Sequence, residues 1–466
     1  MPIPRTHWRR AKQSIDPHET DSLQENKQQK YRSTVTRMRG LFRNQRVNSM
    51  ILIASLRVVS LVTNLGTGMI TAWSLGPAGR GTQAAILLGA LTLSGICSFG
   101  LHTALVYNMK SDPPNKSYYF GSALLIGLIV SLIGVTIGWF ALPWILDKFD
   151  EHTLLAGRLL TFVVPVSVIS YVLNGVLDGH HEFNFVSRLG LLNNFFILCS
   201  LSLLWLSGLL TPATAAMSYL LPTVPITAML AWRATSILRP ATPFHGACLK
   251  RMFTYSVRFF GVDLICTVSG YLDQFLMVLF LNAQDLGLYS VATTAERVLG
   301  IIPASILTVT FPSVAGRSKD DIREIVGITA RLTSIVTTSA AVFLGIFAPY
   351  FLLLLYGPKF AEAIVPFRIL LLSALVSNAV GTFYQMYSGS GRPEIVTVFE
   401  AIGFVIAATS MVILIPFYGI NGVAIAAVLS AAGRLILVLG GLPAVLHLSI
   451  PRLIINWADI KRVFHP

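Results

Sequence analysis

The sequence has few charges and few cysteines for its length of 466 residues. Only 12% of its residues are charged, about half the share found in soluble globular proteins. None of the four cysteines stands in a CxxC or CxxH spacing, so no zinc or redox motif is expected. No apolar run precedes Met50, and we expect no cleaved signal peptide. These absences argue against an ordinary soluble enzyme, a disordered chain or a disulfide-stapled secreted domain.

Apolar residues are abundant and unevenly placed. They make up 54% of the chain, and the mean hydropathy is +0.68. Residues 1–49 hold 11 Lys and Arg against 4 Asp and Glu. This pattern predicts a basic cytosolic tail with a disordered lead, in which Arg37–Arg46 can form a short helix on an anionic membrane surface. No aromatic side chains alternate with these charges as a stacking platform, so we expect no nucleic acid as a partner.

Residues 50–446 read as twelve apolar helices, each longer than the roughly 20 residues needed to cross a bilayer. We therefore predict an all-α polytopic membrane protein with two pseudo-symmetric six-helix lobes around a central cavity. The expected crossings are 48–74, 82–108, 117–146, 153–177, 184–208, 212–238, 252–281, 286–314, 325–356, 361–387, 394–416 and 419–446.

The charges between these helices predict the orientation. With the N-terminus in the cytosol, the loops and the C-terminal tail on that side carry sixteen Lys and Arg. The opposite loops carry only Arg80, Lys148 and Lys359. This bias is typical of a bacterial inner-membrane protein with both termini cytosolic. The predicted domains are lobes at 50–238 and 252–446, a cytosolic linker at 239–251, and basic tails at 1–49 and 447–466.

An internal repeat supports the division into two lobes. Gly81 and Gly287 follow the first helix of each lobe and are 206 residues apart. The turns at Gly179–Glu182 and Gly391–Glu394 are 212 residues apart. Because each copy contains an even number of helices, the repeats are parallel, and a site between them is expected near the middle of the membrane.

Several short motifs now resemble one family. Ser74–Gly81 reads SLGPAGRG and is similar to the first turn of bacterial polysaccharide flippases. YLDQFL, LGLYSVA and FPSVA follow the same family's order in the second half, as do YGPKF and FYGINGVA; these motifs begin at Tyr271, Leu286, Phe311, Tyr356 and Phe417. The family belongs to the multidrug/oligosaccharidyl-lipid/polysaccharide exporter superfamily. Trp73 stands where many relatives carry Arg.

The resemblance implies a transporter, not an enzyme. Its expected substrate is a polyprenyl-diphosphate-linked oligosaccharide, moved to the periplasmic leaflet by alternating access for surface polysaccharide or exopolysaccharide synthesis. Membrane lipids, a polysaccharide polymerase and glycosyltransferases are the expected partners. No cofactor is expected beyond a coupling proton or sodium gradient. The alternatives are a multidrug exporter of the same superfamily, a peptidoglycan-precursor flippase, and a membrane polysaccharide polymerase or ligase.

Ionisable residues inside the predicted crossings are the candidate site residues, because such residues are costly in a membrane and often functional. Arg57 and Asp263 occupy equivalent places in the two lobes, about ten residues from the cytosolic ends of their helices. In the resembled fold these helices flank the central cavity. Arg57 is a candidate to bind the diphosphate through its planar fork, with Asp263 restraining it when no substrate is bound. A static salt bridge between the lobes is the alternative.

The other candidates lie in the second lobe. Asp273 and Arg297 lie at similar depth on neighbouring antiparallel helices, so they are expected to pair. We predict substrate-binding roles for Arg297 and Arg434, and gating or coupling roles for Asp273, Glu296 and Asp263. Glu296 or Asp263 can carry a coupling proton. No catalytic residue and no metal site is predicted.

Overall fold

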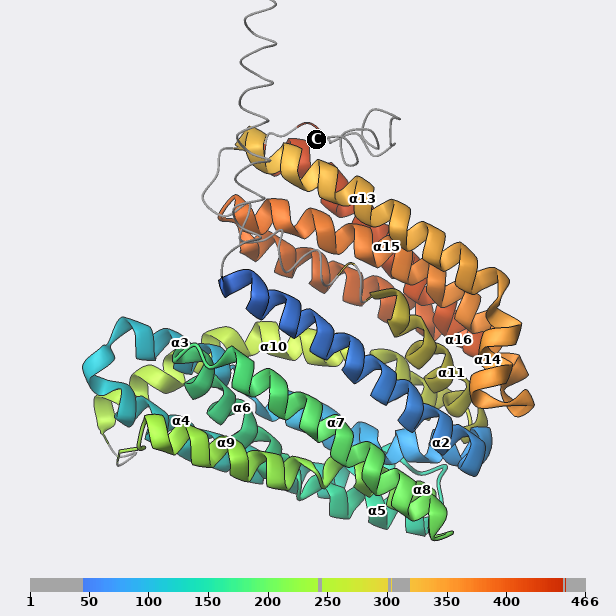
Figure 1. The fold of residues 1–466 in the computed structure, drawn as a ribbon, viewed down its shortest axis with the longest axis horizontal. Helices are drawn as coiled ribbons and strands as arrows, with labels where there is room; N and C mark the ends of the chain where they lie inside the picture. Colours follow the sequence, from blue (N-terminus) through green and yellow to red (C-terminus); the bar gives the residue numbers. More distant parts are fainter. Residues whose placement is uncertain (1–44, 242–244, 301–302, 304–318, 447–448, 450–466) are drawn as a thin grey trace, which may run out of the picture. The chain divides into compact units, whose positions relative to one another are not determined.

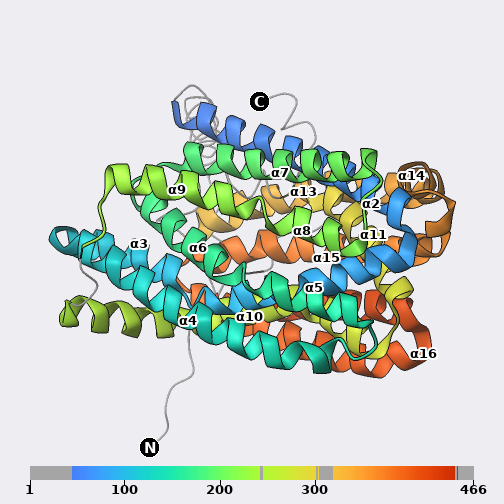
Figure 2. The same cartoon turned by 90° about the horizontal axis from the view of Figure 1, so that it is seen from below.

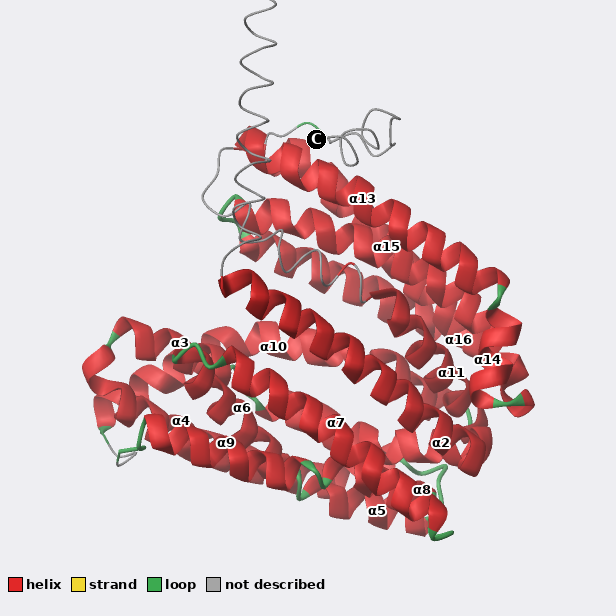
Figure 3. Ribbon diagram, viewed as in Figure 1, coloured by secondary structure: helices red, strands yellow, loops and turns green. Residues whose placement is uncertain are grey.

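The computed structural model describes residues 45–241, 245–300, 303, 319–446 and 449. Helices dominate these residues, and no strand occurs among them (Figure 3). Nine helical stretches in this part of the chain are long and apolar enough to cross a membrane. The expected all-α polytopic class is therefore confirmed. Ile53–Ile454 pack as one compact unit.

The first half of the chain forms a run of helices connected by short turns (Figure 1). They are α2 (Gln45–Cys97), α3 (Leu101–Ser111), the 3₁₀ helix η1 (Pro113–Asn115), α4 (Lys116–Ile145), α5 (Glu151–Thr161), α6 (Val164–Gly179), α7 (Phe183–Leu206), α8 (Pro212–Leu220) and α9 (Thr223–Ile237).

The second half follows with a similar series. It contains α10 (Gly246–Phe280), α11 (Ala283–Glu296), the 3₁₀ helix η2 (Arg297–Gly300), α13 (Lys319–Ile346), α14 (Ala348–Tyr356), the 3₁₀ helix η3 (Pro358–Ala363), α15 (Ile364–Gly389), α16 (Pro393–Gly441) and the π-helical turn η4 (Leu442–Leu446). In this half α15 lies beside both α13 and α16 (Figures 1 and 2).

Two glycines reconcile the nine stretches with twelve predicted crossings. Val58–Ser111 and Glu394–Leu446 are too long for one crossing, since 54 helical residues extend about 80 Å at 1.5 Å per residue. Gly76 and Gly419 interrupt them with positive φ values of 67° and 54°. Each stretch is thus two crossings joined at a glycine. The predicted crossing 286–314 begins as α11 and continues into residues outside the described part.

The turns define two ends of the bundle. The Gly76 end carries the turns at Gly76 and Asn282, and the Asp112 end carries those at Asp112 and Gly391. Each crossing runs from one end to the other.

The buried side chains join the two halves at one end only. A single apolar cluster at the Gly76 end combines Ala85 and Leu142 from the first half with Leu276 and Phe367 from the second. Towards the Asp112 end the halves have separate clusters, around Val172 in the first half and around other residues in the second, which are Ile322, Phe383, Phe399 and Val438. The halves are therefore packed together at the Gly76 end and packed independently at the Asp112 end.

Helix α10 belongs to both packing regions. Its first turns place Cys248 and Met252 in the core of the first half, beside α3 and α4. Its last turns place Leu272 and Leu276 in the shared core at the Gly76 end. This helix also lies against α16, so it connects the two halves along its length.

Candidate functional site

The closest approach between the halves is a contact of two glycines. A Cβ atom placed on Gly81 would lie 1.6 Å from the Ala283 carbonyl oxygen, and one placed on Gly287 would lie 1.8 Å from the Pro77 carbonyl oxygen. Both distances are far below van der Waals contact. Only glycine fits at either position, because the two backbones touch directly.

Trp73 adds a second contact at this end. Its indole N–H donates to the Leu355 carbonyl at 2.9 Å. The same ring lies 3.5 Å from the position a Cβ would take on Gly357, where φ is 90°. Trp73 thus ties the first-half helix α2 to the end of α14, and the aromatic ring replaces the arginine that the family resemblance leads one to expect there.

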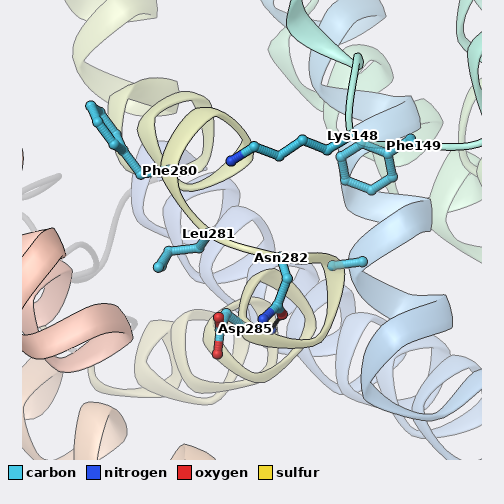
Figure 4. Close-up of a pocket in the computed structure, with 7 residues that line it drawn as sticks. Lys148, Phe149, Phe280, Leu281, Asn282 and Asp285 are labelled. Atoms are coloured by element: carbon cyan, nitrogen blue, oxygen red, sulfur yellow. Dashed lines mark hydrogen bonds between the residues drawn. The ribbon is translucent and has the colours of Figure 1, made fainter.

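Lys148 makes a third contact and lines a pocket of about 350 Å³ (Figure 4). Its ammonium donates to the Leu279 carbonyl at 2.5 Å, at the carboxyl end of α10. A cation is favourable at a helix C-terminus, where carbonyl groups lack helical partners. The remaining lining comes from both halves and includes Phe149, Asn282 and Asp285.

Asp263 lies on α10 and is partly buried. Its Oδ2 accepts a hydrogen bond from the Ser98 hydroxyl at 3.3 Å, across the boundary between the predicted lobes. Asp263 also acts electrostatically on Tyr171 and Cys266. Arg57, the predicted partner of Asp263, lies on α2, but its side chain is outside the described part of the structure.

Arg434 is paired with a carboxylate. Its Nη1 atom donates to both oxygens of Glu400, at 3.2 and 3.0 Å, and its Nη2 atom donates to the Ser377 hydroxyl at 3.4 Å. Both charged side chains are mostly buried, with 21% and 30% of their surfaces exposed. Gly403 makes room for the pair, since a Cβ there would lie 2.5 Å from the Arg434 Cδ atom. Arg434 is therefore neutralised in this conformation.

Asp273, Glu296 and Arg297 lie in one group. Arg297 acts electrostatically on both carboxyls, yet no ion pair within 4.0 Å joins Asp273 to Arg297 in the part of the chain that the structure describes. The Asp273 carboxyl instead accepts from the Gln274 backbone N–H at 2.8 Å and interacts with the Tyr289 hydroxyl. The Arg297 side chain is exposed.

Two tyrosines and one cysteine connect these groups into a chain. Tyr271 lies within electrostatic range of Arg297 and of Tyr171, and Tyr171 lies within range of Asp263. Cys266 lies within range of Asp263 and of Glu400. A continuous series of polar and ionisable side chains thus runs from Asp273 to Arg434. We call this series the polar seam.

Sequence reasoning missed some members of the polar seam. Glu400 and Arg434 lie 19 and 15 residues from the Gly419 kink, on the two arms of α16, so equal depth was a usable signal for their pairing. Ser98 and Tyr171 carry no such signal, because a lone serine or tyrosine inside an apolar helix is common.

Comparisons with known proteins agree with this arrangement. Residues 75–365 match the family described as polysaccharide biosynthesis protein. An uncharacterized membrane protein of Methanocaldococcus jannaschii is 22% identical over 361 residues, which is 71% of each chain.

Solved transporters share the fold. The lipid II flippase MurJ in an inward closed conformation has a TM-score of 0.73 at 12% identity, covering 84% of this chain and 87% of the other. A multidrug resistance transporter of the MATE family has a TM-score of 0.67 in its inward-facing conformation, at 15% identity, with coverage of 82% and 93%. An outward-facing MATE conformation has a TM-score of 0.58, at 15% identity, with coverage of 84% and 93%.

Proposed function

Because this chain belongs to the polysaccharide biosynthesis protein family and is a multi-pass transporter of the multidrug/oligosaccharidyl-lipid/polysaccharide exporter superfamily, we propose that it translocates a polyprenyl-diphosphate-linked oligosaccharide. The membrane is the bacterial inner membrane, and the direction is from the cytosolic to the periplasmic leaflet. The translocated unit then serves surface polysaccharide or exopolysaccharide synthesis, with glycosyltransferases supplying it and a polymerase consuming it.

The packing of the two halves is the observation that carries the mechanism. They share one core at the Gly76 end and have separate cores towards the Asp112 end. Two bodies joined at one end can exchange this contact for one at the other end, which is what alternating access requires. The Asp112 end is then the cytosolic, loading end in this conformation.

The polar seam supplies the proposed binding groups. Arg57 and Arg297 are placed to receive the diphosphate, since guanidinium groups bind phosphate with a planar fork. Arg434 joins them only when it leaves Glu400, so the Glu400–Arg434 pair is a gate. Asp263, Asp273 and Glu296 are the proposed coupling groups for a proton or sodium gradient. The seam holds more carboxylates than a purely anion-binding site needs, and those carboxylates suit such coupling.

A multidrug exporter remains the second candidate, because the MATE transporters share this fold and the seam contains four carboxylates among its described members. A peptidoglycan-precursor flippase is the third, because the lipid II flippase shares it as well. Purified protein in liposomes distinguishes these candidates. A labelled lipid-linked oligosaccharide should change leaflets without change of mass, under at least one imposed gradient, whereas lipid II and a lipophilic cationic dye should move no faster than in empty liposomes.

Preferential movement of the dye would replace the proposal with drug export, and preferential movement of lipid II would replace it with peptidoglycan-precursor transport. A glycan that is lengthened, cleaved or transferred by the protein alone would establish a polymerase or ligase. The orientation is tested separately with reporters fused after Pro466. A cytosolic reporter should be active there, and activity of a periplasmic reporter would contradict the proposed topology.

A further inference from the structure

The first turns of α10 carry a group of arginine and tyrosine side chains. The Arg258 guanidinium lies 5.4 Å from the centre of the Tyr255 ring, and the Arg251 guanidinium lies 6.0 Å from the same centre. Arg251 is also 5.8 Å from the Tyr119 ring. Tyr107 on α3 stacks against Tyr255 with ring centres 4.7 Å apart. Rings at these distances hold guanidinium groups in place without neutralising them.

The positive charge of this group is only partly balanced. Asp112 approaches Arg251 at 3.7 Å, but it already accepts hydrogen bonds from Asn115 at 3.0 Å and from the Tyr119 hydroxyl at 2.8 Å. These hydrogen bonds are the main reason why the pKa of Asp112 lies below its ordinary value. Arg258 is exposed and has no carboxylate within 4.0 Å in the described chain. Two guanidinium groups therefore face one carboxylate that has other partners.

Helical spacing connects this group to the polar seam. Arg251, Tyr255 and Arg258 are separated by four and three residues, so they lie on one side of α10. The same spacing continues along that side through Cys266 to Asp273. Cys266 is exposed and lies within electrostatic range of Glu400. One side of α10 thus leads from the Asp112 end to the seam.

We propose that Arg251, Tyr255 and Arg258 form a loading site for the diphosphate group of the lipid-linked substrate, an inference that rests on the proposed function. The diphosphate carries several acceptor oxygens, and two guanidinium forks held against one ring match them. The site lies at the end where the two halves are packed separately. Substrate therefore meets these arginines before it reaches the seam.

Binding to purified protein in phosphatidylcholine nanodiscs tests this site. The probe is farnesyl diphosphate, and farnesol is the uncharged control. Arg258→Gln should weaken farnesyl diphosphate binding by about tenfold, because it removes a charge-assisted contact. Arg188→Gln is the matched control, since Arg188 is an exposed arginine on α7 at the same end and should leave binding unchanged. Tyr255→Leu should weaken binding, whereas Tyr255→Phe, which keeps the ring, should not.

Equal affinity of Arg258→Gln and wild type would overturn the loading site. So would nanodiscs containing phosphatidylglycerol that abolish farnesyl diphosphate binding, because the arginines would then be a phospholipid headgroup site. The liposome assay separates this failure from failure of the proposed function. Wild type that moves the lipid-linked oligosaccharide while Arg258→Gln binds normally refutes only the site. Wild type that binds in an Arg258-dependent manner but moves nothing refutes only the function.

Discussion

Gly81 and Gly287 are equivalent residues of the two halves and touch each other backbone to backbone. Each backbone occupies the space that a Cβ atom of the other residue's segment would need. The internal repeat of 206 residues thus has a physical counterpart, because the pseudo-symmetry axis of the two halves passes between these two glycines. Their contact is the centre of the closed Gly76 end.

Gly81→Ala or Gly287→Ala should open the Gly76 end, because the added methyl group meets a carbonyl oxygen at 1.6 or 1.8 Å. A cysteine at Leu276, in the shared core, reports the opening. In a background without the four native cysteines, it should react faster with a thiol reagent added from the Gly76 side.

Gly190→Ala is the control for this prediction. Gly190 lies on α7 and has nothing within 4 Å of its would-be Cβ, so alanine should be neutral or add up to about 1 kcal/mol of stability. Unchanged reactivity of the Leu276→Cys thiol in both glycine variants would contradict the closed-end contact.

Lys148→Met should weaken the same end without unfolding the protein. The change keeps an unbranched side chain but removes the hydrogen bond to the Leu279 carbonyl (Figure 4). A hydrogen bond from a charged donor contributes about 1.5–3 kcal/mol, and less at an exposed site such as this one. The Leu276→Cys reporter should therefore react faster. Lys148→Arg should stay near the wild-type rate, and equal rates in Lys148→Met and wild type would refute the role.

Arg434→Gln and Glu400→Gln should each reduce stability by about 1–3 kcal/mol, between the values for exposed and for buried ion pairs. Each single variant leaves one partly buried charge without its partner. The double variant removes both charges and should be closer to wild type than either single variant. Thermal unfolding of all four proteins measures this coupling. Additive losses in the double variant would show that the two charges do not act as a pair.

His181→Gly should stabilise the protein by about 1 kcal/mol, because His181 has a φ of 64°, a conformation that costs a non-glycine residue about 1–2 kcal/mol. Gly391→Ala should destabilise it by a similar amount, since Gly391 has a φ of 76° and no neighbour within 4 Å. Thermal unfolding provides both values. The opposite sign for either substitution would mean that the turn relaxes its backbone.

These two turns also show how far sequence alignment of the halves reaches. The Glu182 N–H donates to the Leu177 carbonyl, and the Arg392 N–H donates to the Tyr387 carbonyl in the same pattern. The equivalent residues are therefore 210 apart, whereas the sequence match of the turns suggested 212. A glycine alignment selects residues of the same type, but a turn is defined by its positive φ, and histidine occupies that place in one copy.

The fold class, the family and the transporter activity were predicted correctly, because apolar length and ordered motifs are properties of the sequence itself. Contacts were harder to predict. Glu400 was recognised as an intramembrane charge, yet its pairing with Arg434 depends on the Gly419 kink between them. Asp273 and Arg297 lie at similar depth as expected, but depth does not determine which way a side chain points. The interaction of Asp273 with Tyr289 follows from that rotation.

Helix α10 is anchored in the core of the first half at one end and in the shared core at the other. A rod clamped in two bodies resists their relative movement unless it bends between the clamps. Gly261 and Gly270 lie in that stretch, and neither has a neighbour within 4 Å of its would-be Cβ. The rate of transport is therefore sensitive to the stiffness of residues 260–271. A genetic screen for slow transport should recover substitutions there that leave substrate affinity unchanged.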